Sequence, residues 1–338
     1  MTVHGGSSRA VLDASLQPAL TSRANRHILR SLPSAQTLLL RSRTATRSDS
    51  SNSSGISGGS STTLPHRPDP GGPKNTHEAA GEARRDTEAG GMVDFSSNDY
   101  LSLSSSLDLR ARFLDHLQAS PNILGAGGSR LLDGGTLEHA LLEERLCAFF
   151  DAPAALLYTS GYDANVGLFA CVPRAQDVVF YDELIHASVH DGLRVSRAST
   201  SNTGTRAFAH NDVHALEGLL ARLVGEREDV REGRANVFVV VESLYSMDGD
   251  IAPLVAICDT VEKLLPNHNG HVIVDEAHAT GVYGPGARGL VALFGLEDRV
   301  AVRLHTFGKA LAGSGGEYEE PLGFRGASDY PFDFQLCS

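Results

Sequence analysis

The chain has little lysine, little cysteine and no long apolar run. Its 338 residues carry 29 basic and 41 acidic side chains, a net charge of −12. A general nucleic-acid binder would usually present a basic surface. No apolar run reaches the roughly 18 residues typical of a membrane-spanning helix. We therefore expect neither nucleic acid nor a membrane as a partner.

Cysteine is too sparse to build a framework. The four cysteines lack CxxC spacing, which excludes a disulfide scaffold and a cysteine-based zinc site and fits a reducing compartment. Residues 1–47 hold seven arginines and one acidic residue, like a mitochondrial transit segment. They can also form an N-terminal helical segment, which is the interpretation we favour. We expect a cytoplasmic protein, with the mitochondrion as the alternative.

Composition divides the chain into four parts. Residues 1–47 form the arginine-rich segment, and residues 48–91 read as a linker or insertion rich in serine, glycine and proline. Residues 92–316 have the pattern of a globular domain. Residues 317–338 have no clear periodicity and form an atypical tail.

The globular part alternates short apolar runs with amphipathic stretches. The runs at 154–158, 177–181, 237–241 and 271–275 predict strands. The stretches at 137–149, 161–170, 212–223 and 253–265 predict helices. This alternation indicates an α/β domain with a mostly parallel sheet. Ligands of such sheets bind beyond the carboxyl ends of the strands, so the residues that follow each strand carry the functional signal.

Three of these strand ends are informative without being specific. Gly161 opens a helix directly behind a strand, where free backbone N–H groups favour phosphate, although an ordinary turn has the same pattern. His186 follows the next strand and could stack on a flat ring or move protons, but a lone histidine is often structural. The polar stretch 242–250 follows a buried strand and also fits a surface loop.

Asp275 and Lys309 raise sharper possibilities. An acid at the end of a buried strand needs a positive partner, which could be a protonated cofactor ring, a salt bridge or a metal shared with His278. No further ligands cluster there, so we expect no metal. Lys309 is the only one of three lysines placed where strand ends converge. A buried amine can form a Schiff base with a carbonyl, although a solvated surface lysine is the alternative.

Taken together, these elements fit pyridoxal 5'-phosphate (PLP). That cofactor needs a phosphate site, an acid for its pyridine nitrogen and a lysine for its aldehyde.

Several ordered motifs between Asp94 and Gly315 resemble the α-oxoamine synthases, which are PLP enzymes of fold type I. The motifs are DFSSNDYL at 94–101, GAGGSR at 125–130, FAHNDV at 208–213, SMDGD at 246–250, DEAH at 275–278 and TFGK at 306–309. FSSNDYL and TFGKAL favour the member of the family that acts in biotin synthesis. The resemblance implies the large PLP-binding domain of that fold.

The resemblance also implies roles for individual residues. Lys309 would hold PLP covalently, Asp275 would pair with its ring nitrogen, His278 would bind its phenolic oxygen, and His186 would stack on its ring. Four further residues would contact or lie near the phosphate: Gly161, Tyr162, Ser246 and Thr306. Arg30 would contact substrate, by an alignment that needs a gap.

The implied reaction joins an amino acid, L-alanine by this resemblance, to an acyl-CoA and releases carbon dioxide, CoA and an amino ketone. A homodimer is the implied assembly. The family chain normally continues into a small C-terminal domain, so this sequence reads as truncated after Gly316. The alternatives are another α-oxoamine synthase, an aminotransferase, or a truncated subunit that is catalytically incompetent.

Overall fold

The computed structural model describes residues 94–120, 125–200 and 204–320. The chain divides into two compact units, one of which spans residues 40–97. Of that unit only 94–97 are described, and there the Asp94 carboxylate accepts hydrogen bonds from the backbone N–H groups of Ser96 and Ser97, at 2.8 and 3.1 Å. The helices and strands below belong to the other unit.

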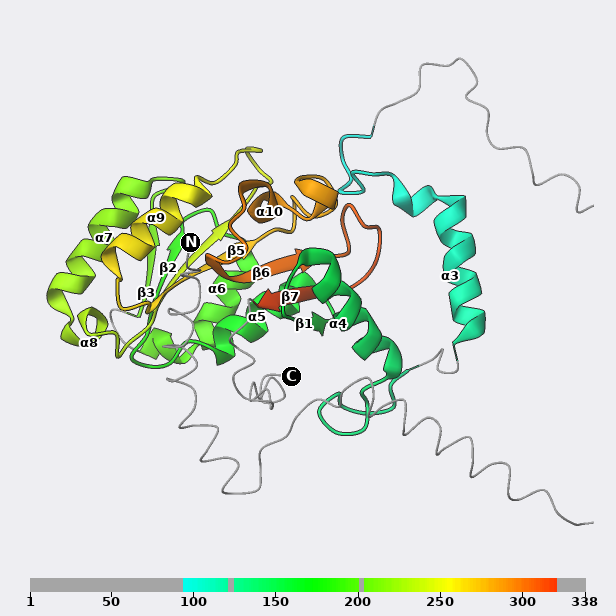
Figure 1. Ribbon diagram of the computed structural model, residues 1–338, viewed down its shortest axis with the longest axis horizontal. Coiled ribbons are helices and arrows are strands. Elements are labelled where there is room, and N and C mark those ends of the chain that lie inside the picture. Colours follow the sequence, from blue (N-terminus) through cyan, green and yellow to red (C-terminus); the bar gives the residue numbers. More distant parts are fainter. Residues whose placement is uncertain (1–93, 121–124, 201–203, 321–338) are drawn as a thin grey trace, which may run out of the picture. The chain divides into compact units, whose positions relative to one another are not determined.

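A single sheet of seven strands runs through this unit in the order β1-β7-β6-β5-β4-β2-β3 (Figure 1). β7 is antiparallel to both of its neighbours, and the other pairings are parallel. The predicted α/β fold with a mostly parallel sheet is confirmed. The strands are β1 (Ala154–Tyr158), β2 (Val178–Asp182), β3 (Thr205–Phe208), β4 (Val237–Glu242), β5 (Gly270–Asp275), β6 (Val300–Thr306) and β7 (Gly316–Glu320).

Helices cover both faces of the sheet (Figure 1). One face packs against α7, α9 and α10, and the other against α5 and α6. The α-helices are α3 (Leu107–Ala119), α4 (Leu137–Phe150), α5 (Gly161–Cys171), α6 (Ala187–Val195), α7 (Val213–Glu226), α8 (Glu228–Arg231), α9 (Leu254–Leu264) and α10 (Leu290–Phe294). Short 3-10 turns lie at Leu103–Ser105, Arg197–Thr200 and Pro285–Ala287.

Alternation along β4 explains this two-sided core. Val237, Val239 and Val241 belong to the cluster under α7 and α9, whereas Phe238 and Val240 belong to the cluster under α5 and α6. Successive side chains of a strand point to opposite faces, so a strand covered on both sides is apolar throughout. All six residues of β4 are buried, as the continuous apolar run predicted.

Polar caps fix the starts of three of the four predicted helices. Thr136, Ser160 and Asp212 each accept a hydrogen bond from a backbone N–H in the first turn of α4, α5 and α7. Such caps satisfy amides that have no partner within the helix. The predicted helices and strands therefore appear within a few residues of the expected bounds.

The end of the globular part differs from expectation. The sequence pattern placed a boundary at 316/317, but Gly316–Glu320 forms β7 and inserts between β1 and β6. Glu317 and Tyr318, which we assigned to an atypical tail, are buried inside the sheet. Residues 321–338 and the N-terminal parts 1–47 and 48–91 lie outside the described residues.

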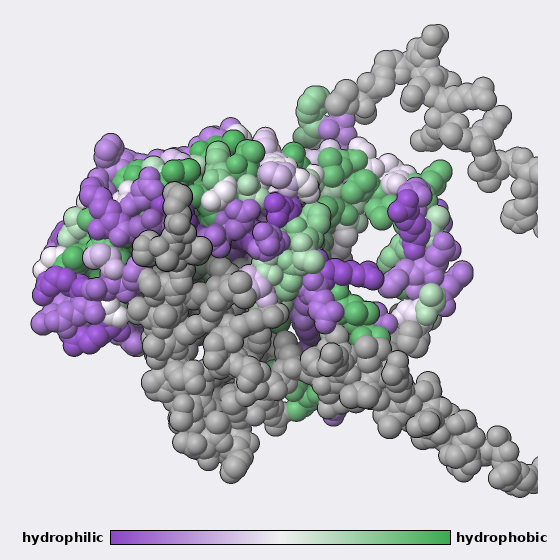
Figure 2. Space-filling model, viewed as in Figure 1, coloured by the Kyte–Doolittle hydropathy of each residue, from purple (hydrophilic) through white to green (hydrophobic). Residues whose placement is uncertain are grey.

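The outer surface over α7 and α8 is largely hydrophilic on the face seen in Figure 2. Within the described residues, no helix combines the length and apolar character needed to cross a membrane.

Candidate active site

Six strands, β1 to β6, run in the same direction and present their carboxyl ends at one edge of the sheet. The residues that follow them include Gly161 after β1, His186 after β2, Ser246 after β4, His278 after β5 and Lys309 after β6. The topology therefore brings together, at one edge, residues that are far apart in the sequence.

Lys309 is held against His278. The lysine Nζ lies 2.7 Å from His278 Nε2, and Tyr100 OH lies 2.7 Å from His278 Nδ1. A charged ammonium can only donate, so it donates to Nε2 and leaves the ring proton on Nδ1, facing Tyr100. Tyr100 in turn donates to Asn98 Oδ1 at 3.2 Å. The contact between Lys309 and His278 joins two predicted site residues directly.

Burial shifts the pKa values of this pair. Burial lowers the pKa of Lys309, although the neighbouring acidic groups, Asp275 first and then Glu242, oppose the change. Burial and then the Lys309 charge lower the pKa of His278 to about 4. His278 is therefore neutral at neutral pH, and a larger fraction of Lys309 is the neutral, nucleophilic amine.

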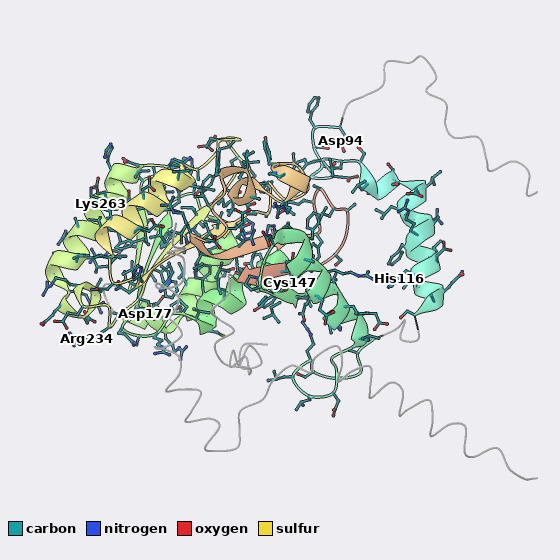
Figure 3. All side chains as sticks on the ribbon, in the orientation of Figure 1. Asp94, His116, Cys147, Asp177, Arg234 and Lys263 are labelled. Atoms are coloured by element: carbon teal, nitrogen blue, oxygen red, sulfur yellow. The ribbon has the colours of Figure 1, made fainter. Side chains whose placement is uncertain are left out.

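The other lysines are placed differently. Lys263 lies near the end of α9 on the outer surface (Figure 3), and its Nζ donates to Glu217 Oε1 at 2.8 Å. Lys74 lies outside the described residues. Within the described part of the chain, Lys309 is thus the lysine at the edge where the strands end.

Asp275 is buried and well supplied with donors. Its Oδ1 accepts from the Ala277 backbone N–H at 2.9 Å, and its Oδ2 accepts from Asn165 Nδ2 at 3.0 Å. Glu242 lies directly beside it on β4, in register across the parallel pair. Burial and then the Asp275 charge raise the pKa of Glu242. Glu242 therefore favours its neutral form.

The start of α5 lies against the end of β6. A Cβ added to Gly161 would lie 3.2 Å from Thr306 Cβ and 3.3 Å from Thr306 Oγ1, so glycine allows this close approach. Ser160 caps Asp163 N at the third position of the helix. The amides of Gly161 and Tyr162 precede it and lie outside the helix's own hydrogen bonding.

The remaining predicted residues are less closely joined. The ring of His186 meets Tyr162 edge-on, with centroids 6.0 Å apart. Ser246 is exposed on the loop after β4, and no bond links it to the other predicted site residues in the part of the chain described. Arg30 lies outside the described residues. The described residues contain no group of three or more potential metal ligands.

Sequence reasoning missed several members of the site. Asn98 and Tyr100 lie in the DFSSNDYL motif, which by itself predicts no role for either residue, although Tyr100 binds His278. Asn165 and Glu242 were also not predicted as site residues, although the position of each in the sequence indicates that it lies near the site. Asn165 lies one helical turn beyond the predicted phosphate turn, and Glu242 is an acid at the end of a buried strand.

Comparison with known proteins identifies the family. A model of the family "Aminotransferase class I and II" matches residues 90–317. The chain belongs to this family. Its resemblance to the α-oxoamine synthases is confirmed by relatives named 8-amino-7-oxononanoate synthase.

An 8-amino-7-oxononanoate synthase of Emericella nidulans is 52% identical over 226 residues, which are 66% of this chain and 54% of that protein. The aminoacyl transferase sphA of Byssochlamys spectabilis is 41% identical over 67% of this chain and 47% of its own length. The chain thus spans about half the length of the curated relatives it matches.

Solved structures agree on the fold. Serine palmitoyltransferase of Sphingomonas wittichii matches with a TM-score of 0.60 and 29% identity, over 71% of this chain and 54% of that one. A serine palmitoyltransferase structure that contains PLP matches with a TM-score of 0.58 and 29% identity, over 70% of this chain and 55% of that one.

Proposed function

We propose that the edge of the sheet around Lys309 binds PLP and serves an α-oxoamine synthase reaction. The observation that carries this proposal is the half-buried Lys309 amine, 2.7 Å from a neutral histidine at the edge where the strands end. The presence of PLP in a solved relative supports the same cofactor.

The side chains present fit this cofactor. Gly161 leaves space at the start of α5, where a side chain would crowd Thr306, and the free amides there suit a phosphate. The Asp275 carboxylate, with its buried donors, suits a protonated ring nitrogen, and His186 suits the ring face. When bound, PLP supplies an electron sink for a carbanion at the amino-acid Cα.

Lys309, His278 and Asp275 would then have different roles in the reaction. Lys309, with its lowered pKa, would hold the cofactor and would accept the Cα proton of the amino acid. His278 would lie beside the phenolic oxygen as a neutral ring, because its pKa of about 4 keeps it uncharged. Asp275 holds the positive charge of the ring nitrogen.

We further propose an amino acid and an acyl-CoA as substrates, with L-alanine as the amino acid and the amino ketone of biotin biosynthesis as the product. The 52% identity to an 8-amino-7-oxononanoate synthase favours this choice. An aminotransferase would use the same lysine and aspartate but would release no CoA. Measuring free CoA after adding alanine and an acyl-CoA distinguishes the two. The implied homodimer stays a prediction for sedimentation analysis.

Borohydride trapping tests the cofactor site. Reduction of the chain with PLP, followed by peptide mapping, should place the label on Lys309. Lys309→Ala should abolish the label, and the control Lys263→Ala should retain it because Lys263 pairs with Glu217 on the outer surface. Label on Lys263 or Lys74 in the unmodified chain would contradict the assignment.

A further inference from the structure

Asn165 joins two predicted cofactor-facing residues inside the protein. Its Nδ2 donates to Asp275 Oδ2 at 3.0 Å and to Ser188 Oγ at 2.9 Å, while its Oδ1 accepts from Tyr318 OH at 2.9 Å. Asn165 and Tyr318 are each 2% exposed, and Ser188 is fully buried. Both the nitrogen and the oxygen of this buried amide are therefore hydrogen-bonded.

Tyr318 sets the orientation of this amide. A phenol hydrogen is donated to Oδ1, so the NH₂ group must face the other way, toward Asp275 and Ser188. Burial raises the pKa of Tyr318 well above its ordinary value, which keeps the hydroxyl protonated as a donor. Both amide hydrogens of Asn165 therefore point toward Asp275 and Ser188.

Ser188 links Asn165 to His186 by hydrogen bonds of fixed direction. The backbone N–H of Ser188 donates to His186 Nδ1 at 3.2 Å, and that ring nitrogen caps α6. An N–H can only donate, so Nδ1 carries a lone pair and the ring proton resides on Nε2. Ser188 Oγ, 2.7 Å from Nδ1, therefore donates as well, and its own lone pair accepts from Asn165.

We propose that Asn165 is a positioning residue that fixes the Asp275 carboxylate and the His186 ring as one unit. This proposal rests on the proposed function, because positioning these two groups matters only if PLP binds beside them. A ring nitrogen that carries positive charge needs an ionised carboxylate at its edge, and a neutral imidazole avoids repulsion over its face. The directed bonds from Tyr318 through Asn165 favour both states.

Substitution of Asn165 tests the role. Asn165→Ala should raise the dissociation constant for PLP, measured by fluorescence quenching, about tenfold or more, because a buried bond to a charged group is lost. It should also change the pH dependence of the bound cofactor's absorbance, since Asp275 loses a donor. An unchanged dissociation constant and pH dependence would overturn the proposal.

Asn236→Ala is the matched control. Asn236 is also buried, and its backbone N–H and Nδ2 contact the buried Asp177 Oδ1 at 2.9 and 3.4 Å, but it precedes β4 at the opposite edge of the sheet. It should lose stability without losing PLP affinity. An equal loss of affinity in both variants, measured on folded protein, would assign the effect to general destabilisation and refute the positioning role.

Two further measurements keep the test decisive if Asn165→Ala does not fold. Tyr318→Phe removes one hydroxyl and should weaken PLP binding several-fold. Unchanged binding would overturn the claim that Tyr318 orients the Asn165 amide. Long-range ¹⁵N NMR of the PLP-free chain should find the His186 proton on Nε2, and a proton on Nδ1 would refute the bond direction. If the unmodified chain binds no PLP, the proposed function itself fails, whereas normal binding in the unmodified chain confines any failure to Asn165.

Discussion

At Lys309, the chemistry depends on what surrounds one amine. Burial lowers its pKa, and the neighbouring His278 adds no positive charge because its own pKa is about 4. The same burial would penalise Asp275 if two donors did not face its two oxygens. The lowered pKa values of Lys309 and His278 therefore suit the proposed chemistry.

Asp275→Asn tests the charge at this position. An amide offers one acceptor oxygen where two N–H donors now converge, so we expect a stability loss of about 1–3 kcal/mol. With PLP and alanine, exchange of the Cα hydrogen with D₂O should slow by two orders of magnitude or more, about 3 kcal/mol in the barrier. Circular dichroism checks the fold. Exchange at the unmodified rate in folded protein would exclude the role.

Contacts between neighbouring elements support the residues of the site at two places. α5 carries Asn165 and α6 carries Ser188, and the two helices meet closely at Gly192. On the other side of the edge, His210 after β3 bridges Asp182 of β2 and Asp250 of the loop after β4, at 2.8 Å each. Each junction predicts a measurable effect.

Gly192→Ala should force α5 and α6 apart. The added Cβ would lie 2.9 Å from Asn165 O and 3.0 Å from both Phe169 Cβ and Val166 Cα. We expect a loss of about 1–3 kcal/mol in urea unfolding, despite the better helix propensity of alanine. Gly218→Ala on α7 is the control, because nothing lies within 4 Å of its added Cβ. It should gain about 0.5–1 kcal/mol. A stabilised Gly192→Ala variant would refute the close packing.

The His210 bridge predicts a loss of stability at high pH. Burial lowers the pKa of His210, but the bonds and charges of Asp182 and Asp250 outweigh it, so the net pKa is raised. Glu183, which accepts from the His210 backbone N–H at 3.0 Å, and the edge-on ring of Tyr245 also face this group. The protonated bridge therefore stabilises the fold fully below about pH 6.5, the unfolded value, and this contribution disappears as pH rises through the higher folded pKa.

Urea unfolding measured from pH 5 to 9 tests the bridge. The unmodified chain should lose about 1 kcal/mol relative to His210→Gln as pH rises, the scale of a partly exposed ion pair. Asp250→Asn should flatten the profile in the same way. Parallel profiles for the unmodified chain and both variants would contradict a protonated bridge.

Local signals predicted the strands, the caps and Lys309, whereas contacts between distant segments could not be predicted. β7 was missed because Gly316–Glu320 has three acidic residues among five, and only pairing with β1 and β6 on both sides buries it. Tyr318 and Asn165 are 153 residues apart, so neither indicates the other in the sequence. The role of His210 likewise depends on Asp182 of β2 and on Asp250 in the loop after β4.

At the scale of the whole molecule, one sheet separates two apolar clusters that depend on the same strands. β4 and β5 contribute alternate residues to both clusters, so loss of either cluster removes support from the strands that the other needs. Leu220 of α7 lies in one cluster and Leu168 of α5 in the other. The two faces should therefore unfold together.

Cys258 reports on this coupling. It is 1% exposed on α9, and burial raises its pKa to about 12, so a thiol reagent should reach it only when the domain opens. Leu220→Ala and Leu168→Ala should each cost about 2–5 kcal/mol, because each truncates a buried leucine. At 1.36 kcal/mol per tenfold, labelling of Cys258 should accelerate about 30-fold to several thousand-fold in both variants. Half-buried Cys171, distinguished by peptide mapping, serves as the native-state reference. If Leu168→Ala on the opposite face left the Cys258 rate unchanged while lowering the unfolding midpoint, the two clusters would be opening independently.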